Sequence, residues 1–194
     1  DVTDFVKTFE LKHLALDPKN PMSVDPMTSG SLLMKFRESH LNAMQRAINV
    51  IDDVDKEFES VFGRSYGGVI DTYLCDDAEI ILVTIGSPTG TAREAIDIAR
   101  ETGIKVGLLK VRFMRPFPAD RIKEVLKNKK GFAVIDRSVS FGWNTNPLYV
   151  EVKSAAGELC DKMSNFSAIG GLGGADITLQ HVIDCIEKLN EISK

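Results

Sequence analysis

The chain has 194 residues, 43% of them hydrophobic and 27% charged, with a formal net charge of −4. This composition is typical of a globular protein, and the slight acidity gives no general attraction to nucleic acid or to anionic membranes. No apolar run is long enough for a membrane-spanning helix, and the charged start DVTDFVKTFE has no signal-peptide pattern.

Residues 1–30 show no sustained periodicity and contain Pro18, Pro21 and Pro26 followed by Gly30. This pattern predicts an extended linker or arm. Because the first residue is Asp1 and not Met, we expect the chain to be part of a longer polypeptide.

Residues 31–62 carry apolar side chains at steps of three and four, which predicts one long helix with Gly63 as its terminator. A helix of this length often crosses between domains or covers a partner. We assign 31–64 to a long helix that leads into an α/β domain over 65–194.

From residue 65 onward, apolar strands alternate with amphipathic helices. The predicted strands are YGGVIDTYL at an edge, then AEIILVTI, IKVGLLKV, GFAVID and NFSAIGG, and the predicted helices are TAREAIDIARETG, PADRIKEVLKN, NPLYVEVKSAAGELC and DITLQHVIDCIEKLNEIS. Strands that are apolar throughout are buried on both faces. The sequence therefore predicts a three-layer α/β/α sandwich with a mostly parallel five-stranded sheet, preceded by the long helix and the arm.

Ligands in this architecture gather at the carboxyl ends of the strands. The first such end is the turn GSPTGT, whose anion-contact candidates are Gly86, Ser87, Thr89, Gly90 and Thr91. The turn has neither the Lys-Ser/Thr pair of a phosphate-binding loop nor the second glycine of a dinucleotide fold. We expect Thr91 and Glu94 to form a capping box, which favours a structural turn over a phosphate site.

Three arginines, Arg112, Arg115 and Arg137, follow the next two strands. Their guanidinium groups could clamp a carboxylate or phosphate, or pair with acidic residues of another domain, and we favour the interface role. The glycine-rich turn at 170–174 is not specific for a nucleotide, and Asp176 or Thr178 can cap the helix that follows it.

The cysteines Cys75, Cys160 and Cys185 have no spacing that suggests a disulfide framework, a zinc site or an iron–sulfur site. We expect Cys160 and Cys185 to be small core residues, and we expect a reducing, cytoplasmic location. The three histidines are scattered, and we assign none of them a catalytic role.

Several stretches together resemble one family. They are AMQRAINVIDDVDKEFESVFGRSYG, AEIILVTIGSPTGTAREAID, GIKVGLLKVRFMRPFP, VIDRSVSFG and IGGLGGADIT. Over residues 31–190 the chain resembles the alpha chain of the pyruvate:ferredoxin oxidoreductases, within the wider 2-oxoacid:ferredoxin oxidoreductase family. The α/β part is also similar to the carboxyl-terminal domain of transketolase-type enzymes.

The resemblance implies an enzyme that converts pyruvate, CoA and oxidised ferredoxin to acetyl-CoA, CO₂ and reduced ferredoxin. It implies thiamine diphosphate, Mg²⁺ and [4Fe-4S] clusters in the whole enzyme, held by other domains or chains. None of the corresponding motifs occurs here, so we expect no catalytic residue, bound cofactor or metal in this chain. The implied role is to support the active-site domains and build the subunit interface, with the upstream alpha-chain part, the other subunits and ferredoxin as partners.

Two alternatives stay open. The chain could be a stand-alone anion- or nucleotide-binding module that uses Gly86–Thr91 and the three arginines. The substrate of the whole enzyme could also be another 2-oxoacid, such as 2-oxoglutarate.

Overall fold

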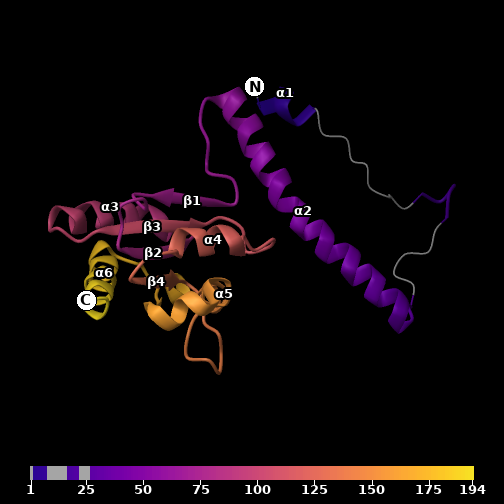
Figure 1. Cartoon of the computed structure of the whole chain (residues 1–194). Helices are drawn as coiled ribbons and strands as arrows, with labels where there is room; N and C mark the ends of the chain where they lie inside the picture. Colours follow the sequence, from indigo (N-terminus) through magenta and orange to yellow (C-terminus); the bar gives the residue numbers. More distant parts are fainter. Residues whose placement is uncertain (1, 8–16, 22–26) are drawn as a thin grey trace.

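The computed structural model describes residues 2–7, 17–21 and 27–194. Within this part of the chain, no helix is both long enough and apolar enough to cross a lipid bilayer. Figure 1 shows a sandwich of helices and strands from which one long helix projects.

The sandwich is built on one five-stranded sheet, as the sequence predicts. Four strands run parallel, and the first pairs antiparallel with the third at one edge. The spatial order is β1-β3-β2-β4-β5. The strands are β1 (Ile70–Tyr73), β2 (Ile80–Ile85), β3 (Val106–Val111), β4 (Gly131–Asp136) and β5 (Ser164–Ile169).

Helices cover both faces of this sheet, which confirms the three-layer arrangement. Helix α3 (Pro88–Glu101) and α6 (Leu179–Ile192) pack together over one face. Helix α4 (Ala119–Leu126) and α5 (Pro147–Ala156) pack together over the other. Gly157 ends α5, and two 3-10 turns follow, η1 (Gly157–Lys162) and η2 (Leu172–Gly174).

The two inner strands are buried along nearly their whole length. Every residue of β4 is buried, and so are all residues of β2 except Ile85. Their side chains alternate between two apolar cores, one under α4 and α5 and one under α3 and α6. Burial on both faces explains why these strands read as unbroken apolar runs.

The long helix α2 (Gly30–Phe62) has 33 residues and contains no buried residue. It ends where the sequence predicts, because Gly63 adopts the left-handed conformation (φ 69°) and donates its N–H to the Glu59 carbonyl. A short helix, α1 (Val2–Lys7), lies within the segment that the sequence suggests is an extended arm. The rest of that arm lies outside the described residues except for 17–21 and 27–29.

Two carboxylates join α2 to the sandwich. Asp55 accepts hydrogen bonds from the Ser65 hydroxyl (2.5 Å) and from the amides of Tyr66 (3.1 Å) and Gly67 (3.2 Å). Asp52 pairs with Arg121 of α4 at 2.5 Å. The connecting segment is therefore tied to the helix by Asp55 before it enters β1.

Asp55 should make the attachment of α2 sensitive to acid. The hydrogen bond from Ser65, together with backbone amides and the Arg112 charge, lowers the pKa of Asp55 despite its desolvation. The folded state thus favours the carboxylate, so its stabilising effect is present above the unfolded pKa of about 4 and is lost as pH falls below that value. We expect Asp55→Asn to be less stable than wild type at pH 7 and to lose less stability between about pH 5 and pH 2.

Denaturant unfolding across that pH range measures this effect. Asp53→Asn is the matched control, because the Asp53 side chain is 73% exposed and pairs with Lys56 on its own helix. If Asp55→Asn and wild type lost the same stability on acidification, Asp55 would not be the acid-sensitive contact.

Candidate functional site

The topology has a switch point at the carboxyl edge of the sheet, between the neighbouring strands β2 and β4. After β2 the chain turns to α3 on one face, whereas after the adjacent β4 it turns to α5 on the other face. The two connections diverge, and this is where ligands bind in open α/β sheets. We refer to the region between the turn 86–91 and the loop 137–145, where the switch-point rule places a ligand, as the crevice.

Hydrogen bonds within the chain hold the turn that follows β2. Gly86 adopts a left-handed conformation (φ 71°), and the buried Thr89 hydroxyl donates to the Gly86 carbonyl at 2.8 Å. The same hydroxyl lies 3.0 Å from that of Thr84. Thr89 is thus a structural residue of the turn.

The predicted capping box of Thr91 and Glu94 is wrong. Helix α3 begins at Pro88, so Thr91 already lies within its first turn, and Ser87 occupies the N-cap position without a side-chain capping hydrogen bond. Proline presets the helical φ angle at a first-turn position, which starts the helix earlier than the threonine pattern suggests. Gly90 also lies inside the helix.

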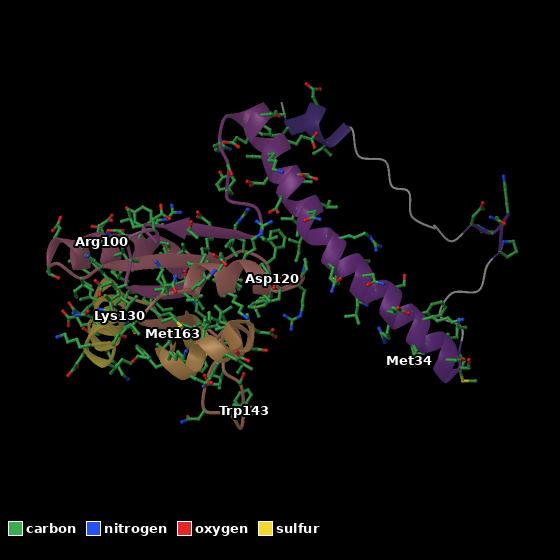
Figure 2. The ribbon with its side chains drawn as sticks, viewed as in Figure 1. Met34, Arg100, Asp120, Lys130, Trp143 and Met163 are labelled. Atoms are coloured by element: carbon green, nitrogen blue, oxygen red, sulfur yellow. The ribbon has the colours of Figure 1, made fainter. Side chains whose placement is uncertain are left out.

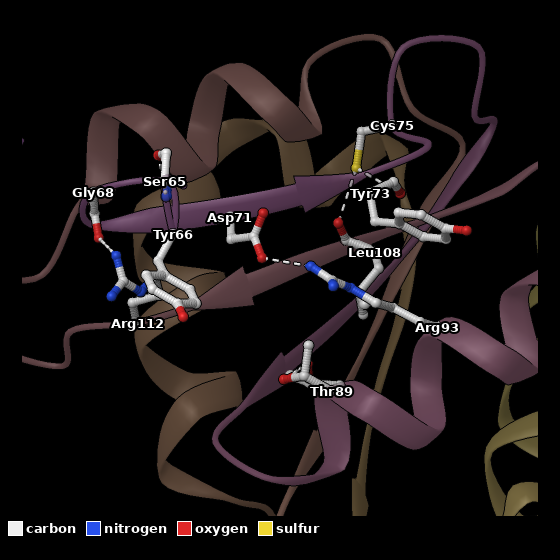
Figure 3. Close-up of polar contacts among 12 residues, drawn as sticks. Ser65, Tyr66, Gly68, Asp71, Tyr73, Cys75, Thr89, Arg93, Leu108 and Arg112 are labelled. Carbon is white, nitrogen blue, oxygen red and sulfur yellow. Dashed lines mark hydrogen bonds and ion pairs between the residues drawn. The ribbon is translucent and has the colours of Figure 1, made fainter. Parts of the chain in front are cut away.

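The three predicted arginines do not converge on one site. Arg112 donates to the Gly68 carbonyl at 2.6 Å, as Figure 3 shows, and lies 3.5 Å from Asp55. Arg115 pairs with Glu151 of α5 at 2.6 Å. Only Arg137 reaches the crevice, so the three guanidinium groups do not form one anion clamp.

Arg137 bridges the crevice. Its guanidinium donates to the Gly171 carbonyl (3.1 Å from Nη2) and to the Ser87 hydroxyl (3.4 Å). A Cβ atom at Gly171 would lie 2.7 Å from the Arg137 Nε, and Gly171 has a positive φ of 71°. The positive φ favours glycine at 171, and a larger residue would also displace the Arg137 side chain, which sequence reasoning did not anticipate.

Asp136, at the end of β4, occupies the amino-terminal end of α5. This buried carboxylate accepts from the Arg137 amide (2.7 Å) and the Leu148 amide (3.3 Å). A helix amino terminus attracts an anion, and here the chain supplies its own. The VIDRS stretch marks this position in the sequence, but the role of its aspartate was not predicted.

The loop after Arg137 exposes two aromatic side chains. Phe141 is 93% exposed and Trp143 is 77% exposed, on a loop closed by a β-bridge between Ser140 and Thr145. Figure 2 shows Trp143 on the part that projects beyond the helices. Exposed large aromatic side chains beside a crevice are typical of a protein interface.

The three cysteines and His181 have structural surroundings. Burial raises the pKa of all three thiols, so they are protonated at neutral pH, with Cys75 buried and Cys160 and Cys185 half-buried at the rims of the two cores. His181 completes a capping box with Thr178 at the start of α6, so of the two predicted caps the structure selects Thr178. Among the described residues, no three His, Cys, Asp or Glu side chains group as metal ligands.

A protein family and two individual proteins are similar to this chain in sequence. The sequence of residues 78–182 matches the protein family described as pyruvate:ferredoxin oxidoreductase core domain II. The alpha subunit of an NADH-dependent phenylglyoxylate dehydrogenase from Aromatoleum evansii is 41% identical over 91% of this chain and 44% of its own length. The pyruvate synthase subunit PorA of Methanosarcina barkeri is 38% identical over 100% of this chain and 48% of its own length.

A solved structure shares the fold. The 2-oxoglutarate:ferredoxin oxidoreductase of Magnetococcus marinus, determined with 2-oxoglutarate, CoA and succinyl-CoA, superposes with a TM-score of 0.51 at 15% identity, covering 85% of this chain and 24% of that one. The chain spans about half the length of the curated relatives it matches.

Proposed function

Because the chain belongs to the pyruvate:ferredoxin oxidoreductase family, we propose that it is a supporting and interface domain in the alpha chain of a 2-oxoacid:ferredoxin oxidoreductase. The observation that carries the proposal is the family match, which runs from just before β2 into α6 and so includes both turns of the crevice. The enzyme oxidises a 2-oxo acid with CoA, giving an acyl-CoA, CO₂ and reduced ferredoxin.

The carboxyl-edge contacts support a structural role for this domain. The polar side chains of this edge form hydrogen bonds within the chain itself. These side chains are the guanidinium of Arg137, the carboxylate of Asp136 and the hydroxyl of Thr89. In the enzyme that we propose, thiamine diphosphate, Mg²⁺, the iron–sulfur clusters and CoA are held by other domains or chains.

The substrate we propose is a 2-oxo acid, with pyruvate as the first candidate. PorA is named for pyruvate synthesis, whereas the relative with 41% identity acts on phenylglyoxylate, an aromatic 2-oxo acid. 2-Oxoglutarate is the alternative. The partners are the remaining part of the alpha chain, the other subunits and ferredoxin, with Phe141 and Trp143 as contact residues.

The test of activity uses the assembled enzyme, purified through an affinity tag on this chain. We expect it to reduce ferredoxin or a viologen dye when supplied with CoA and a 2-oxo acid. Parallel assays with pyruvate, 2-oxoglutarate and phenylglyoxylate identify the substrate. A purified assembly that oxidises none of them would contradict the proposed function.

Calorimetric titration of the 194-residue chain separates this role from the anion-binding alternative. We expect no binding of thiamine diphosphate, CoA or ATP at micromolar concentration. Micromolar binding that is lost in Arg137→Ala and kept in Arg46→Ala, on the exposed surface of α2, would establish an anion-binding module instead.

A further inference from the structure

Strand β5 forms an open edge of the sheet. It pairs with β4, and in the described part of the chain no other strand lies beside it. The amides at its two ends, those of Ser164 and Gly170, donate to carbonyls of the β4 segment. Backbone groups face alternate sides along a strand, so those of Asn165, Ser167 and Ile169 point away from β4. Among the described residues, these outward amides have no hydrogen-bond acceptor.

The sequence of β5 does not protect this edge from pairing. Proteins commonly block an unpaired edge strand with a charged residue or a proline, or cover it with a loop. The strand SNFSAI has neither residue type, whereas the opposite edge strand β1 carries Asp71, which pairs with Arg93 at 2.7 Å. The chain also leaves β5 toward the inner strands, because the Gly171 carbonyl accepts from Arg137, the residue that follows β4. These features are typical of an edge that pairs with another strand.

We propose that two copies of this chain pair through β5 in the antiparallel direction, so that their two sheets become one continuous sheet. A two-fold axis at Ser167 sets this residue opposite Ser167 of the other copy, and sets Asn165 opposite Ile169. The outward backbone groups then occupy hydrogen-bonded positions, in which each pair exchanges N–H···O bonds in both directions. A two-fold interface requires this kind of self-complementarity.

The side chains on the α6 face of β5 fit this register. Phe166 of one copy faces Ala168 of the other, which places a large side chain against a small one. The Lys188 ammonium lies 4.6 Å from the centroid of the Phe166 ring, and Asp184 lines the same cavity as Ala168. Lys188 therefore comes near Asp184 of the other copy. Neither has a salt bridge among the described residues, and Asp184 accepts from the neutral Gln180 amide at 2.8 Å, so both charges can pair between copies.

The α5 face of the same edge has an open groove. A cavity of about 590 Å³ borders β5, and its lining includes Tyr149 and Val150 of α5 and Trp143 of the preceding loop. The side chains of Val150, Trp143 and Ile169 are exposed. A second copy covers this groove, because the α5 helices of both copies lie on the same face of the joined sheet.

The pairing goes beyond the proposed function, because it concerns this chain alone, and it is tested on the 194-residue chain without the enzyme. We expect sedimentation to give the mass of a dimer. Ser167→Pro should weaken dimerisation on the order of 100-fold, because it removes the central amide that each copy donates and leaves the bonds to β4 in place. Ser167→Ala keeps that amide and should remain a dimer, and circular dichroism verifies that both variants fold. A monomeric wild type, or a folded Ser167→Pro variant that dimerises as tightly as Ser167→Ala, overturns the proposal.

Charge reversal on the exposed side of α6 tests the register without changing the strand. Asp184→Lys sets like charges against Lys188 of the other copy, and Lys188→Asp does the same against Asp184, so each variant alone should dimerise roughly 10-fold more weakly. When the two variants are mixed, the attractive pairs return, and we expect native mass spectrometry to find the heterodimer. Single variants that dimerise as tightly as wild type, or a mixture without heterodimer, overturn the proposal.

Amide hydrogen exchange identifies what occupies the edge. In the dimer we expect slow exchange of the Asn165, Ser167 and Ile169 amides, which becomes fast on dilution to the monomer. The Phe166 amide faces β4 and should exchange slowly at both concentrations. Fast exchange of the outward amides in a dimer would mean that the copies pair elsewhere, and it overturns the proposal. Protection that appears only in the assembled enzyme also overturns it, because another chain then occupies the edge.

Discussion

Replacing Gly107 with alanine is expected to lower the free energy of unfolding by about 2–3 kcal/mol and the melting temperature by about 5–10 °C. A Cβ atom at this position of β3 would lie 2.8 Å from both the Cys75 Cα and the Leu74 carbonyl oxygen, and 3.0 Å from the Ala78 Cβ. These are backbone or backbone-attached atoms, so no flexible side chain can swing away. Thermal and denaturant unfolding measure the loss.

The segment that faces Gly107 is itself held in place. Lys129 donates to the carbonyls of Cys75 (2.7 Å) and Ala78 (2.8 Å), and Arg100 donates to that of Leu74 (2.8 Å). An added methyl group must therefore strain β3 or break these bonds.

Gly90→Ala is the matched control for Gly107→Ala. Gly90 lies in α3, and nothing lies within 4 Å of a Cβ at that position. Alanine has the higher helix propensity, so this change should raise stability by about 0.5–1 kcal/mol. If both substitutions changed the free energy of unfolding equally, the close contacts at Gly107 would not destabilise the alanine variant.

The sequence predicted the sheet because its signal is local. Strands such as β2 and β4 are buried on both faces, and each strand is therefore a continuous apolar run that can be recognised without knowing its neighbours. Gly63 likewise acts within one helical turn, so the end of α2 was predicted correctly.

The contacts of the crevice were not predicted because they join residues far apart in the chain. Arg137 meets Ser87 and Gly171 across separations of 50 and 34 residues, and no spacing pattern signals such pairs. The Thr91–Glu94 capping box failed for a different reason. Pro88 and Thr91 are both typical of a helix start, and α3 begins at Pro88, so Thr91 lies inside the helix and cannot cap it.

Replacing Asn146 with alanine is the second substitution for which we expect a large effect, a loss of about 2–3 kcal/mol in the free energy of unfolding. Asn146 is fully buried, and its side chain forms hydrogen bonds with three backbone groups. Its side-chain oxygen accepts from the Tyr149 amide (2.7 Å) and caps α5, while its Nδ2 donates to the carbonyls of Ala168 (3.1 Å) and Val134 (3.4 Å). One amide thus joins β4 and β5 to the helix that covers them.

Thr178→Ala isolates the capping part of this effect. Thr178 caps α6 through the His181 amide at 3.3 Å, but its side chain is exposed and makes no cross-strand bond. Its loss should cost only about 0.5–1 kcal/mol, and the difference between the two variants measures what the buried Asn146 amide contributes between β4 and β5. Denaturant unfolding of both proteins gives that difference. Equal losses would mean that Asn146 acts as a helix cap alone and that the position of α5 over the sheet depends on apolar packing.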